Sequence, residues 1–234
     1  MYVYGLTAAG RDVDARGIGD APVSTVEHGE LAAIVSAVGV APLRAKRRDL
    51  LRHSDVLQAA FTDAPVVPLR FGTVFSSKEE LVGDFLGARY EELVALLQRV
   101  EGLAELRVRA SFVERALLAE VVRDDPRVAA LRAAPNASQV ELGEAVAHAV
   151  AARRVEAADE AVATLAGHAI QVQADEPSSE YEVLRASFLV DRRHVTAFEL
   201  AAEQLAQRQR GRITMELVGP MPPHSFVSLG GGRR

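Results

Sequence analysis

Short segments in which apolar and polar residues alternate recur in the second half of the chain, and this alternation is typical of half-buried β-strands. Between them, apolar residues recur at steps of three and four, which predicts helices. The predicted strands cover residues 106–112, 170–174, 184–190 and 213–217. The predicted helices cover residues 113–134, 138–167 and 195–205. The order β-α-β-β-α-β, with a doubled first helix, predicts a modified ferredoxin-like antiparallel sheet with helices on one face.

The first half predicts a separate domain with both strands and helices. Its predicted strands cover residues 2–6, 23–27 and 31–38, and its predicted helices cover residues 47–61 and 77–100. Residues 65–72, between the helices, are predicted to be extended, because a proline biases the residue before it away from the helical region. Gly29 supplies a hairpin turn, because glycine tolerates positive φ. The fold class is therefore α+β with two domains. We place an N-terminal α+β domain at residues 1–102, and a C-terminal ferredoxin-like domain with a proline-rich extension at residues 103–234.

Composition narrows the class of protein. The chain contains no cysteine, which excludes disulfides, thiolate metal sites and cysteine nucleophiles. No apolar run approaches the ~18 residues of a membrane span, and the N-terminus lacks the basic and apolar regions of a secretory signal. The net charge of −5 argues against nucleic acid as the main partner. We therefore expect a cytoplasmic protein that binds neither nucleic acid nor a lipid membrane.

The sequence contains no set of residues with the spacing of a known catalytic site. The six histidines show no metal-ligand spacing, and we interpret them as scattered surface or turn residues. A phosphate-binding loop and a serine-nucleophile motif are both missing from the sequence. Paired carboxylates lie in helical or capping contexts, where solvated helix surface explains them. We expect no catalytic residue, no metal site and no cofactor, and we expect that the protein is not an enzyme.

One dense basic patch stands out near the start of the helix predicted over residues 47–61. It contains Arg44, Arg47, Arg48 and Arg52. One interpretation is an ordinary solvated helix face, with Asp49 and Asp55 nearby. The other is a site for an anionic surface or an acidic partner. The sequence leaves both open.

Two stretches contain features that helix and strand patterns alone do not explain. In Pro-Leu-Arg-Phe-Gly-Thr-Val-Phe at 68–75, Arg70 interrupts an apolar run, so its guanidinium must reach water or find acceptors. It is either a hydrogen-bond hub or a partner contact. In Gly-Pro-Met-Pro-Pro-His-Ser-Phe-Val at 219–227, closely spaced prolines impose a stiff, extended path. This segment either packs back against the first domain or offers a docking strip.

These two stretches, in this order, resemble the signatures of the GvpF/GvpL family of gas vesicle proteins. The opening Tyr-Val-Tyr-Gly and the junction at 97–106 are also similar to the family, so the resemblance covers nearly the whole chain. The family usually has Trp and Tyr where this chain has Met221 and His224. The family-signature positions, which we take as candidate partner contacts, are Arg70, Phe71, Gly72, Gly219, Pro220, Pro222, Pro223 and Phe226.

The resemblance implies an accessory or structural protein in gas vesicle formation, without established enzyme activity or cofactor. It implies binding to the hydrophobic gas vesicle shell protein and to other accessory gas vesicle proteins during assembly, in the cytoplasm and in association with gas vesicles. A free strand edge is one means of holding an apolar partner, by β-augmentation. The alternative is a small-molecule-binding regulatory module on the ferredoxin-like sheet, which predicts a closed pocket with convergent polar groups.

Overall fold

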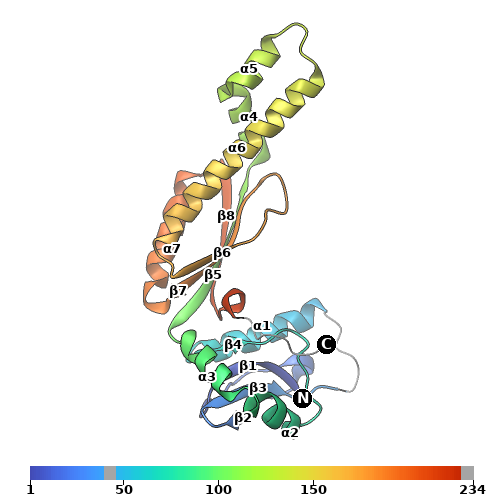
Figure 1. Ribbon diagram of the computed structural model, residues 1–234, viewed down its shortest axis with the longest axis vertical. Coiled ribbons are helices and arrows are strands. Elements are labelled where there is room, and N and C mark those ends of the chain that lie inside the picture. Colours follow the sequence, from blue (N-terminus) through green and yellow to red (C-terminus); the bar gives the residue numbers. More distant parts are fainter. Residues whose placement is uncertain (40–45, 228–234) are drawn as a thin grey trace. The chain divides into compact units, whose positions relative to one another are not determined.

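The computed structural model describes residues 1–39 and 46–227 (Figure 1). Its contacts divide the chain into two compact units. Residues 1–105 and the C-terminal segment from residue 220 form the N-terminal unit, and residues 106–219 form the C-terminal unit. The sequence-based division differs in that it assigns the proline-rich extension to the C-terminal domain. The difference arises because this extension makes long-range hydrogen bonds to Gln58 and Glu105, which no local pattern reveals.

The N-terminal unit contains a four-stranded antiparallel sheet in the order β2-β3-β1-β4. Its strands are β1 (Tyr2–Ala8), β2 (Val23–His28), β3 (Leu31–Ser36) and β4 (Val67–Pro68). Its helical segments are η1 (Ile18–Asp20), α1 (Arg47–Phe61), α2 (Lys78–Glu80), η2 (Leu81–Gly87), α3 (Tyr90–Arg99) and η4 (His224–Phe226). The predicted hairpin forms with Gly29 at φ +59°, and the helix predicted over 77–100 forms as three consecutive segments, α2, η2 and α3.

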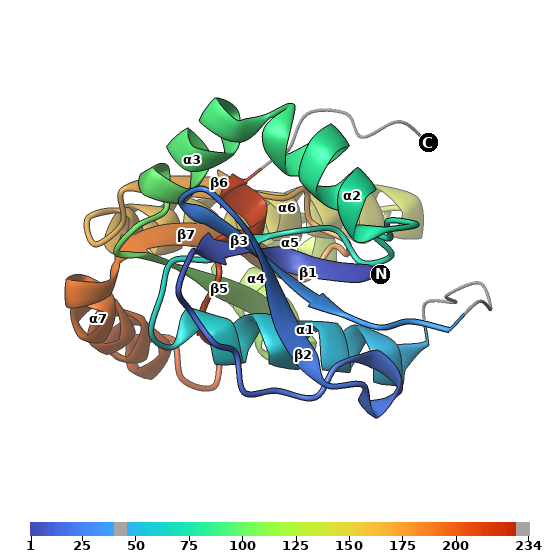
Figure 2. The ribbon, with the colours of Figure 1, turned by 90° about the horizontal axis from the view of Figure 1, so that it is seen from below.

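Helices cover both faces of this sheet. Figure 2 shows α1 on one side of β1 and β3, and the α2–α3 segment on the other. A bulge between Val3 and Gly5 breaks the strict alternation of β1, so Val3 and Leu6 both join the core under α2, η2 and α3. Tyr2 and Gly5 face α1, because Tyr2 bonds to His53 and Gly5 abuts Leu57. All six residues of β3 are consequently buried.

The close approach of α1 to β1 requires glycine at position 5. A Cβ atom there would lie 2.8 Å from the Leu57 side chain and 2.8 Å from the Val67 carbonyl oxygen. We expect Gly5→Ala to lower the free energy of unfolding by about 1–3 kcal/mol, because the strand must shift away from a backbone atom. Urea unfolding measures this loss. Gly143→Ala is the control, since Gly143 lies in a helix with no neighbour near its Cβ position, and it is expected to stabilise the protein by about 0.5–1 kcal/mol.

The C-terminal unit has the predicted ferredoxin-like arrangement, a four-stranded antiparallel sheet in the order β6-β7-β5-β8. Its strands are β5 (Leu103–Phe112), β6 (Gln171–Ala174), β7 (Glu182–Asp191) and β8 (Ile213–Met221). Its helices are α4 (Glu114–Asp124), α5 (Pro126–Ala133), α6 (Gln139–Ala166), η3 (Arg192–His194) and α7 (Val195–Arg208). Alternate residues of β5 and β7, such as Val108 and Phe188, pack with Leu165 and Phe198 of α6 and α7 in one core.

The doubled first helix is in fact three helices. The break falls at Asp125, whose carboxylate accepts hydrogen bonds from the backbone of Arg127 and Val128 and so caps α5. Pro126 occupies the first position of α5, where its missing N–H costs nothing. Figure 1 shows α4 and α5 lying against the N-terminal half of α6. This unit is therefore a ferredoxin-like sheet with a helical extension.

Candidate functional site

The first signature stretch forms a tight turn after β4. The Arg70 carbonyl accepts hydrogen bonds from the Thr73 N–H at 3.2 Å and from the Thr73 hydroxyl at 2.8 Å. Gly72 lies at φ +92°, which suits the third position of a type II turn. The chain then runs antiparallel to the start of β1, where Val3 donates to Thr73 and Phe75 donates to Met1. The turn is thus attached to the sheet at both ends.

Arg70 is exposed on this turn. No acceptor contacts its guanidinium within the parts of the chain that the structure describes. Of the two sequence-based interpretations, the placement does not support a hydrogen-bond hub. Val74, close by on the same segment, is 49% exposed. The turn therefore presents the Arg70 side chain and one apolar side chain to solvent.

A buried hydrogen-bond relay from β1 and α1 holds this turn in place. The Tyr2 hydroxyl accepts a bond from the Gly72 N–H at 3.1 Å and donates to Nδ1 of His53 at 2.9 Å. Nε2 of His53 lies 3.2 Å from the Leu69 carbonyl oxygen, which can only accept. The neutral ring must therefore carry its proton on Nε2. The Phe71 ring packs 6.0 Å from Tyr2 and 5.8 Å from His53, measured between ring centroids.

The interpretation of all six histidines as surface or turn residues is wrong for His53, which is only 6% exposed. Burial lowers the pKa of His53 to about 4, although its hydrogen bond to Leu69 acts in the opposite direction. Burial also raises the pKa of Tyr2 to about 12. Both groups are therefore neutral at pH 7, far from the range useful for general acid–base work. The relay acts as a structural clamp on the signature turn.

The second signature stretch packs along the N-terminal unit. The carbonyl of Pro220 accepts a hydrogen bond from Nε2 of Gln58 at 3.1 Å. The fully buried carboxylate of Glu105 accepts bonds from the Ser225 N–H at 2.7 Å and from its hydroxyl at 2.8 Å. Of the predicted contact residues, Gly219 and Pro220 are exposed, Phe226 is half-buried, and Pro222 and Pro223 are buried. The prolines thus serve mainly to pack this segment.

Helix α1 connects the two signature stretches. Its His53 contacts Leu69 and Phe71, and its Gln58 contacts Pro220. Sequence reasoning singled out both stretches, but it missed Tyr2, His53 and Glu105, because hydrogen bonds between residues so distant in sequence leave no local pattern. The position of a histidine in a helical sequence does not show whether its side chain faces the core or water. That becomes clear only when the buried side of the helix is known.

The predicted basic patch lies partly on the same helix. Arg47, Arg48 and Arg52 are exposed on α1, whereas Arg44 lies outside the described residues. The Nε of Arg48 is 3.4 Å from a carboxylate oxygen of Asp49, and the Arg48 side chain is 76% exposed. The solvated-face interpretation therefore accounts for their exposure, and the interpretation of the patch as a binding site stays a proposal.

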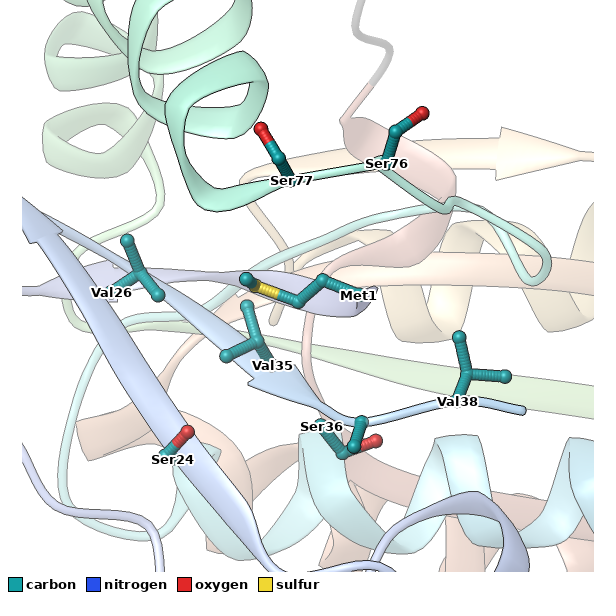
Figure 3. A pocket seen from close by; sticks show the side chains of 9 residues that line it. Met1, Ser24, Val26, Val35, Ser36, Val38, Ser76 and Ser77 are labelled. Atoms are coloured by element: carbon teal, nitrogen blue, oxygen red, sulfur yellow. The ribbon is translucent and has the colours of Figure 1, made fainter. Parts of the chain in front are cut away.

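An open hollow of about 380 Å³ lies over one end of the N-terminal sheet (Figure 3). Figure 3 shows the Met1 side chain between the strands that carry Val26 and Val35 and the loop that carries Ser76 and Ser77. Its lining is apolar or hydroxyl-bearing and has no ionisable side chain. It lies in the N-terminal unit and not on the ferredoxin-like sheet, so it does not favour the alternative function predicted for that sheet.

A cluster of charged side chains in the C-terminal unit has a structural role. Glu182 is buried and accepts hydrogen bonds from Arg109, Arg185 and the Ser178 N–H. Burial opposes ionisation, but the hydrogen bonds from Ser178, Arg185 and Arg109 lower the pKa of Glu182 to about 2. A carboxylate held ionised in this way ties β5, β7 and the preceding loop together.

Within residues 1–39 and 46–227, no group of three or more histidine, aspartate or glutamate side chains is placed to hold a metal ion. None of the helices described there is long and apolar enough to cross a bilayer.

Comparisons with known proteins agree over the whole chain. The family model described as "Gas vesicle synthesis protein GvpL/GvpF" matches residues 1–228. Gas vesicle protein F from a Streptomyces species is 36% identical over 244 residues, covering 97% of this chain and 98% of that one. Gas vesicle protein F1 from Halobacterium salinarum is 25% identical, covering 98% of this chain and 93% of that one.

Solved structures show the same fold. The crystal structure of GvpF from Anabaena sp. PCC7120 superposes with a TM-score of 0.87 at 20% identity, covering 98% of each chain. That of GvpF from Microcystis aeruginosa gives a TM-score of 0.80 at 21% identity, covering 97% of this chain and 98% of that one. The family is not known for enzymes. With its two antiparallel sheets, both signature stretches and a full-length family match, the chain belongs to the gas vesicle synthesis protein GvpL/GvpF family.

Proposed function

We propose that this protein is an accessory or structural protein of gas vesicle formation that binds the hydrophobic shell protein and other gas vesicle proteins during assembly. The observation that carries the proposal is the family match over residues 1–228. Binding takes place in the cytoplasm and at the growing gas vesicle. The protein needs no cofactor for this role.

The physical need for such a protein follows from the shell. A shell subunit must expose a large apolar face before it joins the wall, and exposed faces of this kind aggregate. A protein that covers this face transiently keeps the subunit available for assembly. The required activity is therefore reversible binding.

The turn at residues 70–74 supports a contact role within this function. It is rigid, because Tyr2 and His53 clamp it, and it presents Arg70 and Val74 to solvent. A rigid contact loses little conformational entropy when a partner binds. The segment 73–75 itself pairs with the β1 edge opposite β3, so a partner strand would add to the outer side of this segment and not to β1.

Co-purification with the shell protein at low and high salt tests this function. We expect wild-type protein to retain the shell protein and Arg70→Ala to bind it about tenfold more weakly, since one charge-assisted contact contributes ~1.5 kcal/mol. Arg11→Ala, at another exposed arginine of the N-terminal unit, is the matched control and is expected to bind normally.

Two outcomes would contradict parts of the proposal. If wild-type protein retains neither the shell protein nor any other gas vesicle protein at either salt concentration, the binding function is wrong. If wild-type protein binds and Arg70→Ala binds equally well, the function stands but the signature turn is not the contact.

A further inference from the structure

The N-terminal half of α1 exposes leucines and arginines side by side. Leu50 is 43% exposed and Leu51 is 53% exposed. Arg47, Arg48 and Arg52 are exposed around them. We call these five residues the basic–apolar face of α1. The opposite side of the helix is buried in the N-terminal unit.

Helix geometry places these side chains next to one another. Leu51 lies three residues from Arg48 and four from Arg47, and residues at these spacings are neighbours on a helix surface. Arg48 and Arg52, four residues apart, are likewise neighbours. Around the helix the order of these side chains is Leu50, Arg47, Leu51, Arg48 and Arg52, so each leucine has an arginine as its neighbour.

The charges of this face do not serve the stability of the helix. Cations in the first turn are unfavourable because the N-terminus of a helix carries a partial positive charge, and α1 begins at Arg47 with Arg48 following. Like charges at Arg48 and Arg52 repel at their spacing of four residues. Over the described residues, no carboxylate forms an ion pair with Arg47 or Arg52.

The leucines do not serve the core either. The core side of α1 is formed by other residues, among them Val56, Leu57 and Phe61, which are at most 3% exposed. Two large apolar side chains thus remain exposed beside Arg47 and Arg52, for which the described residues provide no carboxylate. An anionic and apolar binding partner would relieve both costs at once.

We propose that the basic–apolar face of α1 docks an acidic amphipathic segment of a partner gas vesicle protein, whose carboxylates pair with the arginines and whose apolar side chains cover Leu50 and Leu51. This inference rests on the proposed function and adds the chemistry of the partner. A helical partner segment with carboxylates four residues apart matches the spacing of Arg48 and Arg52.

Charge and shape favour a protein segment over other anions. A phosphate backbone would pair with the arginines but would leave the leucines in water. An anionic bilayer would have to approach a chain whose net charge is −5. A short acidic amphipathic segment satisfies the cations and the leucines without bringing a large negative surface close to an acidic protein.

The test compares full-length variants for binding to the purified shell protein and to each purified accessory gas vesicle protein of the same organism. Arg48→Glu with Arg52→Glu is expected to weaken binding at least tenfold at low salt and less at high salt, because charge reversal acts mainly through screened interactions. Leu50→Ala with Leu51→Ala is expected to weaken binding at both salt concentrations. All four positions are exposed, so the variants are expected to fold, and circular dichroism checks this.

A matched control separates the site from net charge. Arg127→Glu with Arg132→Glu changes the net charge equally on exposed positions of α5 and is expected to leave binding unchanged. If both double arginine variants lose binding equally, the inference is wrong, because only the net charge of the protein would then matter. Wild-type binding to anionic phospholipid vesicles that is lost in Arg48→Glu/Arg52→Glu, with protein binding intact, would also overturn it.

The two proposals fail differently in this experiment. If wild-type protein binds at least one gas vesicle protein and both α1 variants bind it equally well, the docking face is wrong and the proposed function stands. If wild-type protein binds none of them, the proposed function itself is wrong.

Discussion

Lowering the pH from neutrality to about 4 is expected to destabilise the N-terminal unit by about 3 kcal/mol through His53 alone. The pKa of His53 falls from its ordinary 6.5 to about 4 on folding, because burial disfavours the charged ring. The unfolded chain therefore binds this proton more readily than the folded chain. The contribution of His53 to stability is complete above pH 6.5 and is lost progressively as the pH falls toward 4.

Protonation also disturbs the signature turn. A charged ring carries a hydrogen on Nδ1, the atom that now accepts from the Tyr2 hydroxyl. The Tyr2 hydroxyl then loses its acceptor while still receiving the Gly72 N–H. His224 of the C-terminal segment adds a repulsive charge that lowers the pKa of His53 further. Acid is therefore expected to loosen the turn that carries Arg70.

Urea unfolding at a series of pH values measures this effect. The chain has no tryptophan and three of its four tyrosines, Tyr2, Tyr4 and Tyr90, lie in the N-terminal unit, so tyrosine fluorescence reports chiefly on that unit. In His53→Gln the free energy of unfolding is expected to fall less between pH 6.5 and 4 than in wild type, by about 3 kcal/mol. His148→Gln, at an exposed position, is expected to behave like wild type. If the free energy of unfolding depends on pH in the same way in wild type and His53→Gln, His53 is not the group responsible.

Replacing Glu105 by alanine is expected to release the C-terminal segment and cost about 3 kcal/mol, because two hydrogen bonds to a buried acceptor are lost together. The carboxylate is fully buried and receives the Ser225 N–H and hydroxyl at 2.7 and 2.8 Å. Its removal leaves η4 without this anchor. Residues 220–227 should then exchange their amide hydrogens faster and be cleaved more readily by proteases.

The control for this experiment is Glu101→Ala, which removes an exposed carboxylate from the neighbouring chain. It is expected to change stability by less than about 0.5 kcal/mol. Ser225→Ala removes only the hydroxyl and is expected to have an intermediate effect. Unchanged hydrogen exchange of the Ser225 amide in Glu105→Ala would show that the segment is anchored elsewhere.

The local spacing of apolar residues was sufficient to predict most of the fold. The strict alternation in β5, β7 and β8 and the helical spacing of α6 and α7 are properties of consecutive residues, and they led to the ferredoxin-like order. The end of α4 was missed although Asp125-Pro126 is a recognisable helix start, with a capping side chain followed by proline. β4 lies inside residues 65–72, which the two prolines predicted to be extended, although its two residues are too few to show a period.

The site was predictable only in part. The signature stretches were found because they are continuous in sequence. The relay through Tyr2 and His53 was not, since it joins residues 51 positions apart and depends on which side of α1 is buried. The exposure of Leu50 and Leu51 also depends on which side of α1 is buried. From the sequence alone, a leucine near the start of a helix is expected to lie in the core.

The division of the chain has a consequence for its synthesis. The C-terminal unit is one continuous stretch, whereas the N-terminal unit needs the segment beyond residue 220 to satisfy Glu105. A ribosome delivers that segment only after the whole of the C-terminal unit. The inserted unit is therefore complete in sequence before the unit that surrounds it, and the hydrogen bonds from Ser225 to Glu105 can form only after the whole inserted unit has been made. The first unit to begin folding is thus the last to be completed.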